Sequence, residues 1–153
     1  MSEQKRIRAR AIIIKDNKIV SMYRERNERI FYTFPGGGLE GTETEEQCVI
    51  REVFEEFGIK VNPLKKVYTY ENEISIEHFY VCKWISGTFG TGKGEEFNEN
   101  RNNGEYIPKL IKISEIPSLP LKPTEVAEAF YNDYLKNNTE VRNDVKFILS
   151  EIK

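Results

Sequence analysis

The stretch from Gly36 to Ile59, GGGLEGTETEEQCVIREVFEEFGI, constrains the fold more than any other part of the chain. It opens with three glycines after Pro35, and Thr44 and Gln47 have the spacing of a capping box that begins a helix. Gly58 is a natural C-cap for the same helix. We therefore expect a glycine loop followed by a helix that ends at Gly58.

This helix separates its apolar and acidic side chains. At 100° per residue, four apolar side chains fall within an arc of about 100°. They are Ile50, Val53, Phe54 and Phe57. The carboxylates of Glu52, Glu55 and Glu56 fall on the opposite side. We expect the apolar arc to face the core and the carboxylates to face away from it.

The acidic cluster has two interpretations. It could be an ordinary solvated face of the helix. However, like charges at this spacing cost about 0.2–0.5 kcal/mol per pair, and the negative end of the helix dipole disfavours them further. Mg²⁺ and Mn²⁺ prefer carboxylate oxygen and would neutralise the cluster, so a divalent metal site is the second interpretation.

The spacing over the whole stretch resembles the Nudix box. Gly37 is followed by five residues and Glu43, and then by seven residues and the run REVFEEFGI, which begins at Arg51. The match covers residues 37–59 of 153, and the order of elements expected beyond it also looks like that family. The resemblance implies an α/β (α+β) fold, a Nudix-type α/β/α sandwich with a mixed β-sheet, as a single domain over residues 1–153.

The resemblance also implies a reaction, in which the diphosphate linkage of a nucleoside diphosphate joined to another moiety is hydrolysed with Mg²⁺, or with Mn²⁺ in its place. Glu52, Glu55 and Glu56 match the family's metal-ligating glutamates, and the main-chain carbonyl of Gly37 would be a further ligand. Arg51 would orient Glu52 through a charge-assisted hydrogen bond. Glu43 matches a position that supports this network.

The general base stays open between two regions. It could be Glu52 in the box or a glutamate in the long irregular stretch from Gly87 to Gly104, where Glu95 and Glu96 are adjacent. The spacing to the following strand favours Glu96. These two acids could equally serve only to keep a loop soluble.

The substrate is the least constrained part of this hypothesis. The segment Ile74–Glu77, where subfamily markers of the resembled family fall, has neither the proline associated with ADP-ribose hydrolases nor the tyrosine associated with diadenosine polyphosphate hydrolases. We expect a nucleoside triphosphate or a similar small nucleotide. Arg24, Tyr32 and His78 are substrate-binding candidates, and their alternatives are a solvated loop, core packing and a structural histidine.

Composition excludes several other classes of protein. The net charge of −2 gives no basic field for nucleic acid or a membrane surface, and the apolar runs are far too short for a membrane span. The polar N-terminus and two cysteines, interpreted as reduced thiols, favour a cytoplasmic protein. A homodimer is compatible with the sequence but cannot be derived from it. The alternative function is a catalytically silent Nudix-fold module that senses nucleotides or regulates, although the intact box favours the enzyme.

Patterns elsewhere predict the remaining elements. Strands are expected at Ile7–Ile14, Lys18–Arg24, Phe31–Phe34, Leu64–Tyr70, Ile74–Trp84 and Tyr106–Lys112. A charged loop is expected at Arg24–Arg29, a brief connection at Lys60–Pro63 and an amphipathic helix at Thr124–Leu135. The segment Val141–Ile152 fits a final helix, and DVKFIL within it fits a strand equally well.

Overall fold

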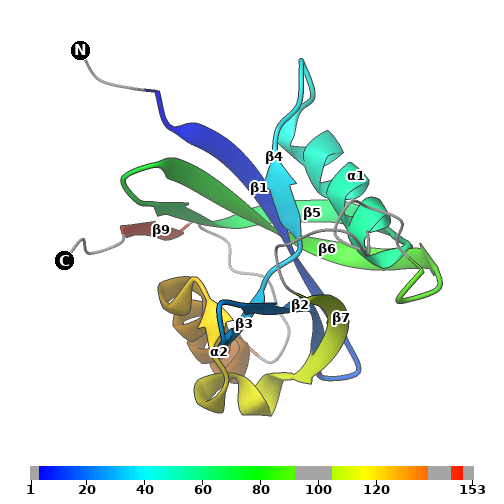
Figure 1. Ribbon diagram of the computed structural model, residues 1–153, viewed down its shortest axis with the longest axis vertical. Coiled ribbons are helices and arrows are strands. Elements are labelled where there is room, and N and C mark those ends of the chain that lie inside the picture. The colour runs from blue at the N-terminus through cyan, green and yellow to red at the C-terminus, as the bar shows by residue number, and fades with distance from the viewer. Residues whose placement is uncertain (1–3, 92–104, 138–145, 150–153) are drawn as a thin grey trace.

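The computed structural model describes residues 4–91, 105–137 and 146–149. Figure 1 shows the elements in chain order. They are β1 (Arg6–Lys15), β2 (Lys18–Arg26), β3 (Arg29–Thr33), β4 (Gly36–Gly38), α1 (Glu45–Phe57), β5 (Ile59–Glu71), β6 (Ser75–Gly87), β7 (Glu105–Lys112), the 3₁₀ helix η2 (Ile113–Ser118), β8 (Leu121–Lys122), α2 (Thr124–Asn137) and β9 (Lys146–Leu149).

The described strands form one curled sheet in the order β8-β3-β2-β1-β6-β5-β9, with β4 added to β1 and β7 added to β2. The pairs β1–β6, β3–β8 and β5–β9 are parallel and the other pairs are antiparallel, so the sheet is mixed. In Figure 1, α1 and α2 lie on opposite sides of it. The predicted α/β/α sandwich with a mixed sheet is confirmed.

Two apolar clusters fill the space between the sheet and the helices. Val53 and Phe57 of α1 pack with Ala9, Ala11 and other residues of the sheet. On the other side, α2 residues pack against the opposite face of the same strands. Successive residues of a strand point to opposite faces, so β1, β2, β5 and β6 each supply residues to both clusters. Cys48 and Cys82 are buried free thiols, as expected.

The first hairpin is confirmed, whereas the predicted charged loop is wrong. Asp16 and Asn17 adopt φ of 53° and 62°, which suits the tight turn between two twisted strands. The same geometry recurs at Asn27 and Glu28, with φ of 52° and 66°, so β2 continues to Arg26. Two residues are enough to reverse the chain, and most of the charged run therefore belongs to strands.

Two further expectations need correction, and one open alternative is decided. The connection expected at Lys60–Pro63 is part of β5, because register shifts on either side of Pro63 let the strand continue past a residue that lacks an N–H. The expected glycine loop is the short strand β4. The C-terminal segment contains the strand β9, one of the two alternatives considered. Most of the long stretch 87–104 lies outside the described residues.

Helix α1 begins and ends as predicted. Thr44 accepts a hydrogen bond from the Gln47 N–H at 3.1 Å, and Gln47 accepts one from the Thr44 N–H at 2.9 Å, which completes the capping box. Gly58 closes the helix in the left-handed region with φ of 76°.

The predicted orientation of α1 is wrong by about a quarter of a turn at 100° per residue. Ile50 and Phe54 are 40% and 52% exposed, although the wheel placed them in the core. The buried residues are Cys48, Val49, Val53, Glu56 and Phe57. The helix therefore turns two of its acidic positions towards β4, which has no side chains to exclude them.

Candidate active site

Strand β4 brings the glycines against the carboxylates of α1. It pairs with β1 so that Gly37 lies opposite Ala9, on the face towards the helix. A Cβ added to Gly37 would lie 2.6 Å from Glu52 Oε2, so the carboxylate fills the space that a side chain would need. The buried Glu56 carboxylate accepts the Gly36 N–H at 3.1 Å. Both carboxylates are thus fixed against main chain.

Arg51 joins the acidic residues into one network. Its Nε and Nη2 donate to the two Glu43 oxygens at 2.8 and 2.9 Å, and its Nη1 donates to Glu52 at 3.0 Å and to Glu55 at 3.2 Å. Nη2 also donates to the Gly38 carbonyl at 3.2 Å. The Arg51 hydrogen bonds lower the pKa of Glu43 to about 2, while Glu43 raises the pKa of Arg51.

The donor atoms here suit a hard divalent cation. Glu52, Glu55 and Glu56 have carboxylate oxygens, and the Gly37 carbonyl, which receives a weak S–H hydrogen bond from Cys48 at 3.5 Å, is a main-chain oxygen near Glu52. Within residues 4–91, 105–137 and 146–149, no three acidic, His or Cys side chains already converge as a ligand set. Glu55, half exposed, is held by Arg51 and would have to turn from it to join the other two.

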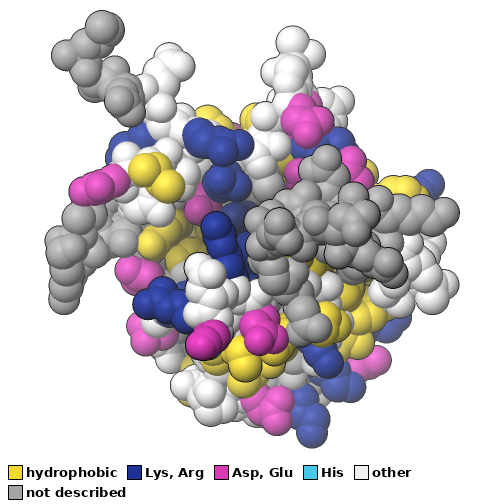
Figure 2. Space-filling model, viewed as in Figure 1, with side chains coloured by type: hydrophobic (Ala, Val, Ile, Leu, Met, Phe, Trp, Pro, Cys, Tyr) yellow, Lys and Arg dark blue, Asp and Glu magenta, His cyan; other side chains and the backbone are white. Residues whose placement is uncertain are grey.

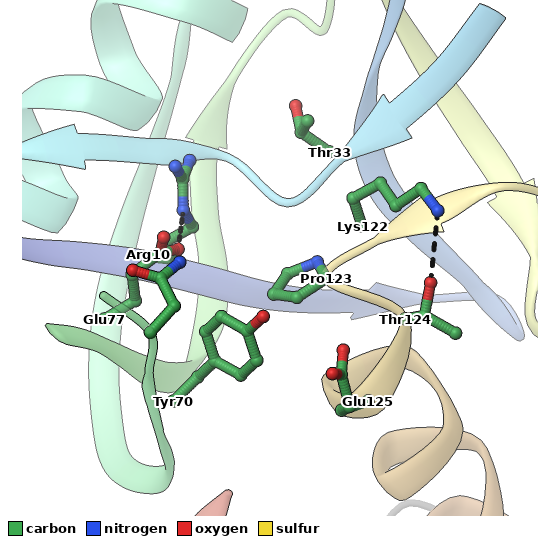
Figure 3. Close-up of a pocket in the computed structure, with 9 residues that line it drawn as sticks. Arg10, Thr33, Tyr70, Glu77, Lys122, Pro123, Thr124 and Glu125 are labelled. Atoms are coloured by element: carbon green, nitrogen blue, oxygen red, sulfur yellow. Dashed lines mark hydrogen bonds and ion pairs between the residues drawn. The ribbon is translucent and has the colours of Figure 1, made fainter. Parts of the chain in front are cut away.

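A polar cavity of about 380 Å³ lies on the other face of β1 from α1, between the sheet and the start of α2. Figure 3 shows Arg10, Glu77 and Tyr70 on one side of it and Lys122, Thr124 and Glu125 on the other. Arg10 Nε donates to Glu77 at 2.7 Å, and its Nη1 donates to the Phe34 carbonyl at 3.2 Å. The volume is sufficient for a small organic molecule.

Arg24 and Tyr32 lie on the sheet formed by β2, β3 and β7. The Arg24 guanidinium stacks 4.1 Å from the Tyr106 ring centroid and donates to the Tyr106 hydroxyl. No acceptor among the described residues meets its buried Nε. Tyr32 packs edge to face on Tyr23, with centroids 5.6 Å apart, so core packing accounts for its position.

His78 contacts Thr69 at 3.0 Å and Glu45 at 3.5 Å. Glu45 belongs to the first turn of α1, about two turns before Glu52. Burial lowers the pKa of His78 and favours the neutral ring. These contacts fit a structural histidine that fixes the start of α1. Glu95 and Glu96 lie outside the described residues.

Sequence reasoning missed the cavity and the residues of β1 beside it. The segment Arg6-Ile7-Arg8-Ala9-Arg10 alternates basic and apolar residues, which is the pattern of a strand with one charged face. That alternation was the available signal. The residues at the start of α2 that line the cavity could not have been found in the same way. They reach the cavity only because segments far apart in the sequence come together in the fold.

Comparison with known proteins identifies the family. The model of the NUDIX domain matches residues 5–129. The 8-oxo-dGTP diphosphatase of Proteus vulgaris is 32% identical over 93 residues, which are 55% of this chain and 83% of that enzyme. The ADP-ribose pyrophosphatase of Methanocaldococcus jannaschii is 44% identical over 109 residues, which are 65% of this chain but 62% of that enzyme.

Solved structures share the fold. A NUDIX hydrolase from Nitrosomonas europaea superposes with a TM-score of 0.72 at 16% identity, covering 98% of this chain and 82% of that one. An ADP-ribose pyrophosphatase from Streptococcus suis gives a TM-score of 0.66 at 19% identity, covering 94% and 99%.

The chain belongs to the NUDIX family. It is a pyrophosphohydrolase, an enzyme that hydrolyses phosphorus-containing anhydrides. No helix in the described part of the chain is long and apolar enough to cross a membrane.

Proposed function

We propose that this enzyme cleaves the diphosphate linkage of a small nucleotide with the help of a divalent metal ion, Mg²⁺ or Mn²⁺. The observation that carries the proposal is the seating of Glu52 and Glu56 against the β4 main chain, with Arg51 clamped beside them. Carboxylates fixed in this way hold a metal and a water molecule at constant positions, which is the main requirement for attack on phosphorus.

Each side chain has a distinct task in this proposal. Glu52, Glu55 and Glu56 would hold the metal together with the Gly37 carbonyl, and the metal would supply positive charge to offset the negative charge of the phosphates and to lower the pKa of a water molecule. Arg51 orients Glu52 through its hydrogen bond, while Glu43 keeps Arg51 in place by accepting two hydrogen bonds from it. Either Glu52 or Glu96 accepts the proton of the attacking water.

The substrate we propose is a nucleoside triphosphate or a similar small nucleotide. The cavity beside Arg10 has room for a nucleoside, with Tyr70 and the polar ends of Lys122 and Glu125 at its walls. The relatives named above act on 8-oxo-dGTP and on ADP-ribose, so both compounds are direct comparisons. The cytoplasm, where such nucleotides occur, is the proposed location.

A release assay over a nucleotide panel tests this function. Purified enzyme is incubated with dGTP, 8-oxo-dGTP and ADP-ribose in Mg²⁺, in Mn²⁺ and in EDTA, and the phosphate-containing products are identified. We expect turnover only with metal, and loss of most activity in Glu55→Gln. The charge-matched control Glu115→Gln alters an exposed residue of η2 and should retain wild-type turnover.

The assay also separates the alternative. A nucleotide-sensing module would bind one of these compounds tightly and release no product with either metal. If the wild type is active, the two candidate bases can be compared. Wild-type turnover in Glu96→Gln together with no turnover in Glu52→Gln would assign the general base to Glu52 on α1. A lowered kcat at unchanged affinity in Glu96→Gln would assign the base to that glutamate.

A further inference from the structure

Three arginines form a row along one face of β1. Arg6, Arg8 and Arg10 alternate with Ile7 and Ala9. The alanines of β1 point towards α1 and are buried there, so the arginines point to the opposite face, the face that carries the cavity. In Figure 2, dark-blue Lys and Arg side chains gather over the middle of the molecule, where Figure 1 places β1.

The members of this row differ in how their charge is compensated. Arg10 is paired with Glu77. Arg8, which lies between the other two and is partly buried, has no hydrogen-bond or ion-pair partner in the part of the chain that the structure describes. Burial lowers the pKa of Arg8, and repulsion from Arg10 and Arg6 lowers it further, while Glu77 and Glu52 offset this effect in part.

The end of the Arg6 side chain lies over Gly38, beside Arg8. In the β1–β4 pair, Arg8 lies directly opposite Gly38, and directly opposed residues project on the same face of a sheet. Gly38 has no side chain, and the nearest atom to a Cβ placed there is Arg6 Nη2 at 3.0 Å. The Arg6 guanidinium therefore lies over Gly38, and the row continues along the same face of β1 through Arg8 to Arg10 at the cavity.

A structural role accounts poorly for this arrangement. Three like charges on alternate residues of a strand repel one another, and burying a guanidinium without a partner costs free energy. A bound anion would offset the repulsion within the row and the partial burial of Arg8. Guanidinium groups match phosphate oxygens in two-pronged geometry, and a chain of phosphates has the repeated negative charge that a row of arginines would neutralise.

We propose that Arg8 binds the phosphate chain of the substrate, and that the Arg6–Arg8–Arg10 row makes the enzyme favour nucleotides with three phosphates over those with two. The assignment extends the proposed function, because the box carboxylates on the other face of β4 would act on the same chain. A nucleoside triphosphate carries more negative charge than ADP-ribose. Replacing Arg8 should therefore weaken the binding of the triphosphate more than the binding of ADP-ribose.

Binding of inorganic anions in EDTA tests the row without turnover. Isothermal titration of the enzyme with tripolyphosphate and with pyrophosphate measures both affinities. We expect tripolyphosphate to bind the wild type more tightly, and Arg8→Gln to weaken its binding at least tenfold with a smaller effect on pyrophosphate. Arg8→Lys should restore part of the affinity. The control Lys83→Gln removes one exposed positive charge from β6 and should bind both anions as the wild type does.

Two results would overturn the assignment. One is an unchanged affinity for tripolyphosphate in Arg8→Gln. The other is an equal loss in the Lys83→Gln control, which would show only a general charge effect. A melting temperature of Arg8→Gln well below that of the wild type would indicate a structural residue, whereas relief of repulsion predicts an equal or higher one.

Kinetics with Mg²⁺ then separate this inference from the function on which it rests. If the wild type hydrolyses nucleotides, we expect Arg8→Gln to raise KM for dGTP more than for ADP-ribose, with a smaller change in kcat. If no nucleotide is hydrolysed, the proposed function fails, and the titration still decides whether the row binds phosphate chains.

Discussion

Replacing Gly37 with alanine would displace Glu52 without disturbing the backbone. The new Cβ would lie 2.6 Å from Glu52 Oε2, 2.7 Å from its carboxyl carbon and 3.0 Å from Oε1, so the whole carboxylate group must move. Gly37 is not among the glycines with positive φ, and alanine can therefore adopt its conformation. The substitution tests the position of one carboxylate while preserving its charge.

The size of the effect follows from the contact distances. Ordinary contact of a Cβ begins near 3.4 Å, so the nearest oxygen must retreat by about 0.8 Å, the difference between 3.4 and 2.6 Å. This movement also stretches the 3.0 Å hydrogen bond from Arg51 to Glu52. Misplacing a catalytic group by about 1 Å can cost about 100-fold in rate. We expect kcat to fall by roughly that factor, with a change in melting temperature of a few degrees at most.

The comparison variant is Gly38→Ala, which adds the same methyl group on the face of β4 away from Glu52 and should therefore keep kcat. Its Cβ would lie 3.0 Å from the far end of the Arg6 side chain, so any effect is expected on KM, through the arginine row. Turnover of the best substrate found in the panel is measured for both variants with Mg²⁺, beside thermal unfolding in EDTA. Wild-type kcat in Gly37→Ala would refute the assignment of Glu52 to the active site, and equal losses in both variants would show that any side chain on β4 is harmful.

Three further substitutions probe the same helix. Val53→Asp buries an unpaired charge and should lower the free energy of unfolding, measured in urea, by several kcal/mol. Phe54→Asp changes an exposed residue and should lower it by less than about 1 kcal/mol. The reverse order would contradict the orientation of α1. Glu56→Gln keeps an oxygen that accepts the Gly36 N–H but removes one charge from the acidic cluster. Most activity should be lost, while the melting temperature in EDTA should stay equal or rise. Full activity in this variant would show that Glu56 is not a metal ligand. Arg51 lowers the pKa of Glu43 from 4.5 to about 2, so the contribution of Glu43 to stability is fully present above pH 4.5 and is lost as the pH falls through about 2. Acid unfolding followed by circular dichroism should therefore be less steep over that range in Glu43→Gln, and identical curves would show that the pair adds nothing.

Local signals predicted the ends of α1 well. A capping box and a C-cap glycine are short-range devices, and they depend on residues three or four positions apart such as Thr44 and Gln47. The strands with alternating residues were also predicted, as were both turn residues of the first hairpin. Each of these features is fixed by neighbours in the sequence.

The face that α1 buries could not be predicted from the helix alone. Ile50 and Phe54 form as good an apolar arc as Val49 and Val53, and the wheel has no means of choosing between them. The choice depends on β4, which pairs with residues of β1 that lie 26 to 30 positions earlier in the chain. The main chain of β4 has no side chains and leaves room for carboxylates. The Gly36 N–H donates to Glu56, which is why the buried arc includes that residue.

Strand β4 explains why the two halves of the proposed site need glycine for different reasons. On the side of α1, Gly37 leaves the volume that the Glu52 carboxylate fills. On the other side, Gly38 leaves the volume that the end of Arg6 fills, beside Arg8. Because successive strand residues point to opposite faces, three glycines in a row clear both faces of one short strand. A strand without side chains can therefore separate negative groups suited to a metal from positive groups suited to phosphate by little more than the thickness of its backbone, and a phosphate chain passing its edge would meet both.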